Sequence, residues 1–295
     1  MDPEPVAQEE PHTQGTPASA SASTSEFDFE FDPVPPTGYT PTPEDVFVVQ
    51  GILTQFAPPE LGLYILSLAD YRPRVCARRH EAVTYEANDF WRPGPEAFVV
   101  GLYLRTPALR SGIPVRASAI TFQLRASDQG WADFGGHGTY RNSHTWFEAS
   151  ILRRRPGHHG DTGNDDETLD SDETLRRPFN TIEKAEERFA ELGWDLVRRD
   201  DEGVGDGSAK TSWFVHTNIT ARAQYHNYRV RWVRGVVDEV PRNPRVVGDG
   251  RGFLDALRPG DRVVLWALAE VSGLLISLNS YCIGTTSWAC ACVTI

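Results

Sequence analysis

Polar and aromatic side chains alternate closely between residues 128 and 146. Such side chains could bind a sugar, because an aromatic ring stacks on its C–H face while carboxylates and amides contact its hydroxyl groups. The candidate ligand-binding residues are Asp128, Gln129, Trp131, Asp133, Tyr140 and Asn142. The same rings could instead close one end of a hydrophobic core, since burying such a ring is worth about 2–3 kcal/mol. The sequence leaves both interpretations open.

The same stretch contains residue types that hydrolases use. Ser143 and His144 with Asp128 or Asp133 would supply a nucleophile, a base and an orienting carboxylate. However, no nucleophile elbow surrounds Ser143, and small triads can be assembled by chance from many loops. Asp128, Asp133 and Glu148 could act as paired carboxylates on a glycoside, but nothing in the sequence sets their separation. We therefore expect a protein without catalytic residues, and a hydrolase of unknown specificity remains an alternative.

Motifs for metals and cofactors fail on their spacing. Cys76, Cys282, Cys290 and Cys292 form neither a disulfide ladder nor a zinc pattern, because Cys290-Ala-Cys292 is too close and no histidine follows it. The glycine-rich stretch 248–253 lacks the lysine and the helix of a phosphate-binding loop. The sequence therefore predicts no metal, no cofactor and a structural turn at 248–253.

Charge and the first residues narrow the partners and the location. The net charge is −12 and the arginines are interleaved with acids, so no nucleic acid partner is expected. The run after Met1 is acidic and rich in proline, with neither a basic nor an apolar signal region. An intracellular site, cytoplasmic or nuclear, with reduced cysteines is the resulting expectation.

Composition and periodicity divide the chain into four segments. Residues 1–40 are rich in Pro, Ser, Thr, Ala and acids, which predicts a disordered acidic tail. Residues 41–80 are predicted as a helical hairpin, because Thr42 can cap a helix and apolar residues then recur at helical spacing. Residues 81–270 show the period of strands. Residues 271–295 contain no charged residue and form an atypical tail.

The period-two segments predict a mainly β fold. They are residues 98–104, 120–124, 147–151, 213–219, 228–232 and 263–268. Short strands with Gly and Pro turns are typical of an antiparallel β-sandwich, of jelly-roll or galactose-binding-like type. An acidic and helical insert at 153–212 interrupts it. The acidic part of this insert is expected to be mobile, and the rest to be one inserted helix capped by Asn180 and ended by Gly193.

Several motifs resemble known families. The stretch PPELGLYILSLADYRPR (58–74) resembles the proline-started helix of F-box-like segments. The stretches DQGWAD, TYRNSHTWFEASIL, SWFVHTNITA and GDGRGFLDALRPGDRVVLWA resemble a group of fungal proteins in which such a helix precedes a β-sandwich. The resemblance covers about 45–155 and 210–270, and the sandwich is similar to F-box-associated and phloem-lectin-type domains, which bind glycans on client proteins.

The resemblance and the loop together predict a non-catalytic binding module. A glycan or a glycosylated protein would bind through 128–146. The alternative is an F-box-like substrate receptor whose residues Leu61, Ile65 and Leu68 contact a ubiquitin-ligase adaptor. This chain departs from an F-box in having only one or two helices before the strands, and the same three residues could simply pack the hairpin on the sandwich.

The tail 271–295 departs from the similar proteins, in which a strand rich in valine and charge follows. Because a splice-donor sequence can encode Val271-Ser272, we hypothesise that the tail is translated intron and that a closing strand is missing. One sheet edge would then be unpaired. A membrane anchor is the competing interpretation, but Asn279 and scattered Ser and Thr make the segment too polar to span.

Overall fold

A computed structural model shows how these segments fold. It describes residues 41–87, 96–109, 116–128, 135–157, 165–199, 210–236, 243–272 and 282–294. All of them belong to one compact unit, Phe31–Ile295. The predicted disordered tail 1–40 lies outside the described residues.

The first described element is the predicted helical hairpin, α1 (Pro43–Leu53) and α2 (Pro59–Leu68). Thr42 caps α1: its hydroxyl accepts a hydrogen bond from the Asp45 backbone at 3.2 Å, and the Asp45 carboxylate accepts one from the Thr42 backbone at 2.8 Å. The hairpin ends earlier than the predicted boundary at residue 80, because residues 74–79 already form a strand.

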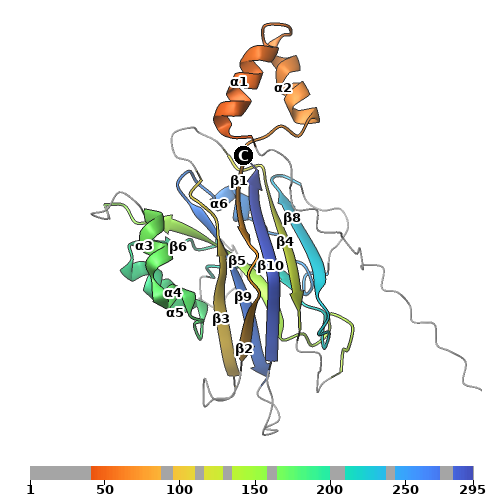
Figure 1. The fold of residues 1–295 in the computed structure, drawn as a ribbon, viewed down its shortest axis with the longest axis vertical. Coiled ribbons are helices and arrows are strands. Elements are labelled where there is room, and N and C mark those ends of the chain that lie inside the picture. Colours follow the sequence, from red (N-terminus) through yellow and green to blue (C-terminus); the bar gives the residue numbers. More distant parts are fainter. Residues whose placement is uncertain are drawn as a thin grey trace, which may run out of the picture. The chain divides into compact units, whose positions relative to one another are not determined.

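The strands among the described residues, ten in all, form two antiparallel sheets, whose arrangement is shown in Figure 1. Sheet A contains β1 (Arg74–Arg79), β2 (Val83–Ala87), β4 (Ala119–Ser127), β8 (His226–Val233) and β10 (Cys282–Thr294). Sheet B contains β3 (Glu96–Arg105), β5 (Thr145–Arg154), β6 (Trp194–Leu196), β7 (Trp213–Thr217) and β9 (Arg262–Ser272). The predicted mainly β, antiparallel sandwich is therefore confirmed.

The strand order is that of a jelly roll. Sheet A runs β1-β10-β4-β8 and sheet B runs β3-β9-β5-β6, with β2 also on β10 and β7 also on β5. Strands β1 and β2 pair with successive parts of β10, so they act as one interrupted edge strand, and β7 and β6 do the same along β5. Each sheet then has four strand positions, as two Greek keys require.

Two hydrophobic clusters hold the sheets. The larger one lies between them and contains the fully buried side chains of Ile120, Phe122 and Leu124, which alternate with outward polar residues on β4. The smaller one covers the other face of sheet B and contains Val264 and Trp266 of β9. Strand β9 is thus buried on both faces, which explains its almost continuous apolar sequence.

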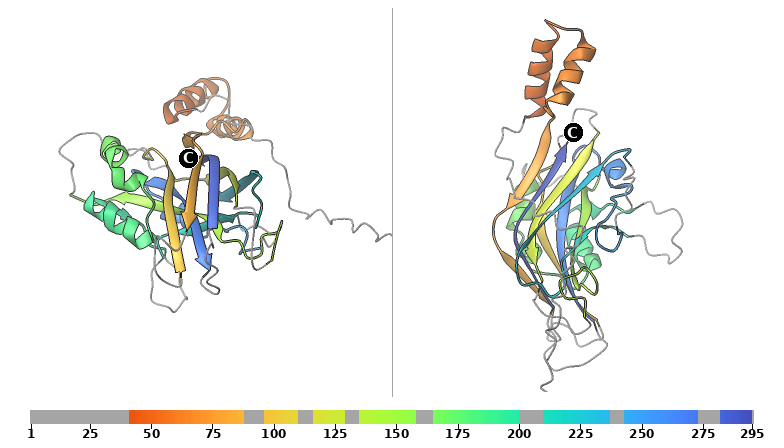
Figure 2. Two further views of the ribbon diagram at one scale, coloured as in Figure 1. Left: turned by 60° about the horizontal axis from the view of Figure 1, so that its bottom comes forward. Right: turned by 90° about the vertical axis from the view of Figure 1, so that its right-hand side faces the viewer.

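The insert differs from the prediction, because its described part holds three helices rather than one. They are α3 (Asp165–Ser171), α4 (Glu173–Arg176) and α5 (Ile182–Glu191). The acidic stretch is ordered there because Leu169 and Leu175 are buried in the smaller cluster, and Asp172 caps α4. The third helix matches the predicted one, with Thr181 rather than Asn180 as its cap. Figure 2 shows these helices beside sheet B.

The charge-free tail also differs from the prediction. Residues Cys282–Thr294 form β10, which occupies a central position of sheet A and pairs with β1, β2 and β4. Ala289, Ala291 and Val293 of this strand face the larger cluster. The expectation that the sandwich lacks a closing strand is therefore wrong for this chain.

Candidate functional site

The predicted ligand loop begins at Asp128, whose side chain is buried at the end of β4. Its carboxylate accepts hydrogen bonds from the Thr145 hydroxyl at 3.1 Å and from the Ala221 backbone N–H at 2.8 Å. The Thr145 hydroxyl accepts in turn from the Asn218 side-chain amide at 3.0 Å. Asp128 thus joins β4, β5 and the turn after β7, and this carboxylate is committed to the fold.

Tyr140 and Asn142 have different surroundings. Tyr140 is half-buried and packs against the larger core cluster, with its ring 5.7 Å from that of His216, which in turn lies 4.5 Å from the ring of Tyr228. Tyr140 therefore fits the alternative in which the loop aromatics close one end of the hydrophobic core. Asn142 is exposed and has a φ of 55°, a left-handed conformation that asparagine tolerates in turns.

The other three predicted ligand residues, Gln129, Trp131 and Asp133, lie outside the described residues. Of the six, the structure therefore places Asp128 and Tyr140 as parts of the packing and Asn142 on a turn. These three do not converge on one exposed surface.

The contacts of Ser143, His144 and Asp128 do not support the hydrolase alternative. The Ser143 hydroxyl donates to the Thr145 carbonyl at 3.2 Å, and the Asp128 carboxylate is bonded as above. Within the described part of the chain, the His144 side chain has no hydrogen-bonded partner, so it is not placed to take a proton from Ser143. The Glu148 carboxylate accepts from the indole N–H of Trp146 at 2.8 Å and from the Ser212 hydroxyl.

The three predicted partner-binding residues are exposed on α2. The exposed fractions are 52% for Leu61, 44% for Ile65 and 69% for Leu68. In the two helices only Gly62 and Leu66 are buried, and neither core cluster includes a residue of the hairpin. These three residues therefore belong to neither hydrophobic cluster.

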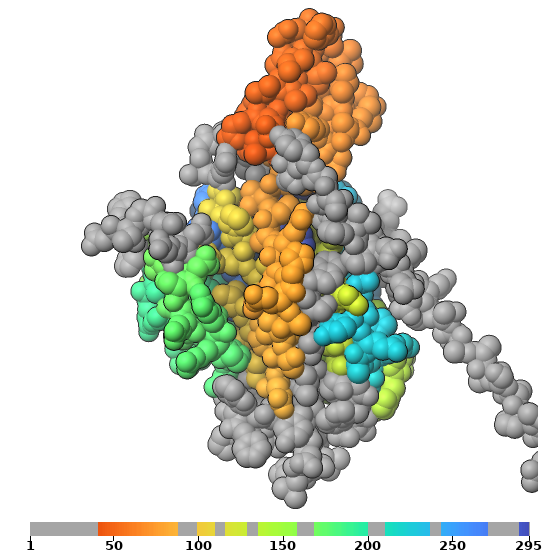
Figure 3. Space-filling view, in the orientation of Figure 1, coloured from red at the N-terminus to blue at the C-terminus, as the bar shows by residue number. Residues whose placement is uncertain are grey.

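The exposed apolar residues of the hairpin form a larger set, which we call the hairpin surface. It comprises Phe47, Val48, Ile52, Phe56, Leu61, Leu63, Tyr64, Ile65 and Leu68. Outside the hairpin, the described residues expose only three further large apolar side chains. Figure 3 shows both helices of the hairpin (orange) open to view on one face. The sequence indicated three of the nine, Leu61, Ile65 and Leu68, as partner-binding residues.

The cysteines differ from the expectation of reduced, unpaired thiols. Cys76 of β1 lies directly opposite Cys292 of β10, and the two form a disulfide between residues 216 positions apart. The Sγ atom of Cys290 lies 3.4 Å from that of Cys292. No local pattern indicates this pairing, since it depends on which strands are neighbours. No group of three metal-ligating residues occurs among the described residues.

Residues 248–252 form the predicted turn, but a short helix begins directly after it at Phe253, which the sequence pattern did not predict. A Cβ on Gly248 would lie 1.7 Å from the Phe214 carbonyl oxygen, and one on Gly250 would lie 2.1 Å from the Trp232 ring. The Trp232 indole N–H donates to the Gly248 carbonyl at 2.8 Å. These two glycines therefore let the backbone of the turn approach Phe214 and Trp232 closely.

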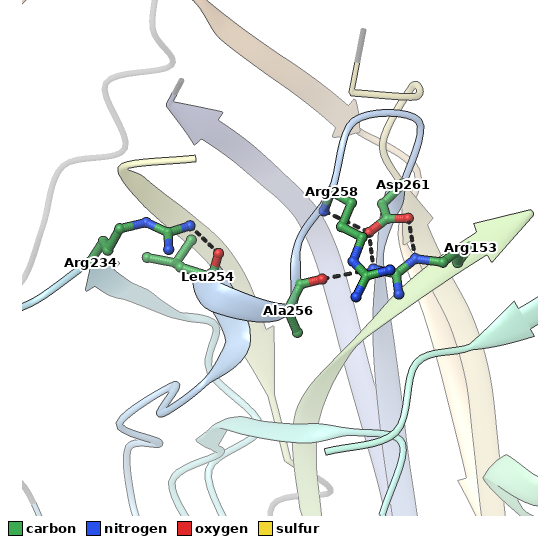
Figure 4. Close-up of polar contacts among 6 residues, drawn as sticks. All are labelled: Arg153, Arg234, Leu254, Ala256, Arg258 and Asp261. Atoms are coloured by element: carbon green, nitrogen blue, oxygen red, sulfur yellow. Dashed lines mark hydrogen bonds and ion pairs between the residues drawn. The ribbon is translucent and has the colours of Figure 1, made fainter. Parts of the chain in front are cut away.

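A buried ion pair fixes the next turn and the short helix α6 (Phe253–Ala256) before it. Arg153 of β5 donates to both carboxylate oxygens of Asp261, at 2.9 and 2.7 Å, and to the Ala256 carbonyl at 2.7 Å (Figure 4). The Asp261 carboxylate also accepts from the Arg258 backbone N–H at 2.8 Å. Arg234 similarly donates to the Leu254 carbonyl. These bonds hold the Asp261 carboxylate and the carbonyl groups of α6 in place.

Comparison with family models, with curated proteins and with solved structures gives no match. Among the described residues, no helix has the length and hydrophobicity needed to cross a membrane.

Proposed function

We propose that this protein is a non-catalytic binding protein whose hairpin surface docks on a second protein. The observation that supports this most is the concentration of nine exposed apolar side chains on one short helical hairpin. Soluble monomers rarely expose contiguous apolar patches of this kind, and those that do usually use them to bind. The predicted glycan site has weaker support, because Asp128 and Tyr140 are held by the fold.

The composition of the hairpin indicates what kind of surface a partner must offer. Phe47, Phe56 and Tyr64 are large aromatic side chains with exposed fractions of 55%, 83% and 61%, and such residues often dominate the energy of an interface. The hairpin also carries Glu44, Asp45 and Glu60 but no lysine or arginine. A matching partner offers an apolar groove bordered by basic side chains, and a pair of helices would lie in it.

The charge of the hairpin disfavours a lipid surface. Helices that bind membranes at the interface usually carry Lys and Arg on their polar face, which attract anionic lipids. The charged residues within 43–68 are all acidic. A protein groove therefore fits the hairpin better than a membrane.

The resemblance of residues 58–74 to F-box-like segments suggests which protein offers the groove. We propose a ubiquitin-ligase adaptor, with the jelly roll as the part that carries a client-binding role. Glycan binding by the loop 128–146 remains an expectation, which the resemblance to lectin-type domains implies.

The experiment is a binding titration between the full chain and the purified ligase adaptor, by calorimetry. Leu61→Asp is the test variant, because Leu61 is exposed and lies in the first turn of α2, where a carboxylate suits the helix dipole and leaves the helix intact. We expect binding to weaken at least about thirtyfold, since an interface hot spot costs about 2 kcal/mol or more.

The matched control is Val236→Asp. Val236 is 60% exposed and lies in the turn after β8, so the same kind of substitution is made outside the hairpin. The control is expected to bind like the wild type. Absence of any binding at micromolar adaptor, or equal binding by Leu61→Asp and the wild type, would overturn the proposal.

A further inference from the structure

Three cysteines gather on the outer face of sheet A. Val75 and Ala77 of β1, and Ala291 and Val293 of β10, pack toward the core. Because side chains alternate along a strand, the cysteines between and beside them face outward. These are Cys76, Cys290 and Cys292.

The three sulfur atoms differ in bonding and in exposure. Cys76 and Cys292 share a disulfide, and both residues are half-buried. Cys290 is a free thiol with an exposed fraction of 5%. Its Sγ lies 3.4 Å from the Sγ of Cys292, within hydrogen-bond distance for two sulfur atoms.

The surroundings keep Cys290 in its thiol form. Burial raises the pKa of this thiol, and Arg78, opposite it on β1, offsets only part of the rise. A protonated Cys290 has a hydrogen to donate, and Cys292 is the sulfur beside it. The arrangement is asymmetric, because the disulfide partner Cys76 lies on another strand, opposite Cys292 rather than opposite Cys290.

We propose that Cys76, Cys290 and Cys292 form a thiol–disulfide exchange site for low-molecular-weight thiols of the glutathione type, in which Cys290 stabilises Cys292 as the leaving group. An external thiolate attacks Sγ of Cys76 and forms a mixed disulfide. The bond between Cys76 and Cys292 breaks, and its electron pair passes to Cys292. The S–H of Cys290 donates to the resulting thiolate, which finally takes a proton from water.

A second external thiolate completes the reaction. It attacks the external sulfur of the mixed disulfide, which releases the oxidised small disulfide and leaves Cys76 as a thiolate. Two external thiols are thereby oxidised to one disulfide, and the protein disulfide is reduced to two thiols. The preference for Cys76 follows from the leaving group, since a sulfur whose charge is stabilised departs faster.

The exchange controls the attachment of one edge strand. In the described part of sheet A, β1 pairs with β10 alone. The disulfide adds a covalent link to the six residue pairs of this ladder. After reduction no cross-link joins β1 to β10, and β1 is held by the strand pairing and by the packing of Val75 and Ala77.

The test follows exchange in the oxidised full-length protein with millimolar reduced glutathione. Samples are quenched with iodoacetamide under denaturing conditions, and the modified cysteines are mapped by peptide mass spectrometry. The expected first product carries glutathione on Cys76 and the alkyl label on Cys292. Glutathione mainly on Cys292, or an oxidised protein without a Cys76–Cys292 link, would overturn the proposal.

Two variants separate the donor from the packing of Cys290. Cys290→Ser keeps a hydrogen-bond donor and is expected to react at close to the wild-type rate. Cys290→Ala removes it and is expected to slow the first step about fivefold, the rate equivalent of a hydrogen bond of about 1 kcal/mol. Equal rates in both variants and the wild type would contradict the role of Cys290. The product map of the wild type remains decisive if either variant fails to fold.

Discussion

The ring of Tyr85 lies directly on the backbone of Gly101. Tyr85 comes from β2 in sheet A and Gly101 from β3 in sheet B, and a Cβ on Gly101 would lie 1.8 Å from the Cε1 atom of the ring. Tyr85 is buried, and burial raises the pKa of its hydroxyl to about 12. The absence of one side chain in sheet B thus makes room for a large ring from sheet A.

Replacing Gly101 by alanine is expected to destabilise the fold. The added methyl group overlaps the Tyr85 ring, and overpacking of a core costs about 1–3 kcal/mol. Urea unfolding followed by tryptophan fluorescence measures the loss. Gly51→Ala in α1 is the control: nothing lies within 4 Å of its added Cβ, so the helix should be unchanged or gain about 0.5–1 kcal/mol. Equal stability of both variants would refute the overlap.

The ion pair between Arg153 and Asp261 is expected to matter far more than an exposed pair. The Asp261 side chain is 2% exposed, so Asp261→Ala leaves the Arg153 guanidinium and the Arg258 backbone N–H without their carboxylate. A loss of about 3–5 kcal/mol is expected in urea unfolding. Asp255 pairs with Arg234, and its own side chain is 71% exposed. Asp255→Ala should therefore lower the free energy of unfolding by less than about 1 kcal/mol. A similar cost for the two variants would contradict this account.

Asp172 is expected to make stability depend on acid. Burial disfavours the ionised form of its carboxyl, but hydrogen bonds from Arg188 and the Leu175 backbone outweigh burial and hold its pKa below the usual value. The carboxylate therefore stabilises the fold above the unfolded-state pKa of about 3.9, and this contribution is lost as the pH falls through the lower folded-state pKa.

The variant Asp172→Asn isolates this contribution. Asparagine can still cap α4, but it lacks the charge that pairs with Arg188. At pH 7 the free energy of unfolding of the wild type should exceed that of the variant by about 0.5–1 kcal/mol. The difference is small because Arg188 is partly open to solvent. The difference should shrink below about pH 4 in urea titrations. A constant difference from pH 7 to pH 2 would argue against the ionised carboxylate.

Strand β10 is expected to be indispensable for sheet A. A chain that ends after Ser272 lacks the only partner of β1 and β2 among the described strands and leaves one side of β4 open. We expect this truncated chain to aggregate, because open strand edges pair with other chains. Size-exclusion chromatography and near-ultraviolet circular dichroism measure the outcome. A monomer with a native spectrum would show that sheet A closes without residues 282–294.

Residues with a strong period could be placed from the sequence. The alternation around Phe122 and the helical stripe of Ala185 and Phe189 both led to the observed burial, because each pattern depends only on local geometry. The capping of α1 by Thr42 was equally local. Elements whose residues form caps and regular faces are therefore predictable in this protein.

Features that depend on distant neighbours could not be placed in this way. The inward residues of β10 include Ala289 and Ala291, which carry too little hydrophobic contrast to indicate a central strand. The pairing of Cys76 with Cys292 needs the strand order as well. In the candidate site, Leu61 is exposed because no other part of the fold covers it. A local sequence pattern does not show whether a helix face will be covered.

The central position of β10 has a consequence for synthesis on the ribosome. Cys76 leaves the ribosome 216 residues before Cys292, its partner across the strand pair. During that interval β1 and β2 have no neighbour in sheet A, while sheet B can already assemble β3, β5 and β9. The nascent chain therefore presents bare strand edges until β10 emerges, and a chaperone that covers such edges would raise the yield of folded protein.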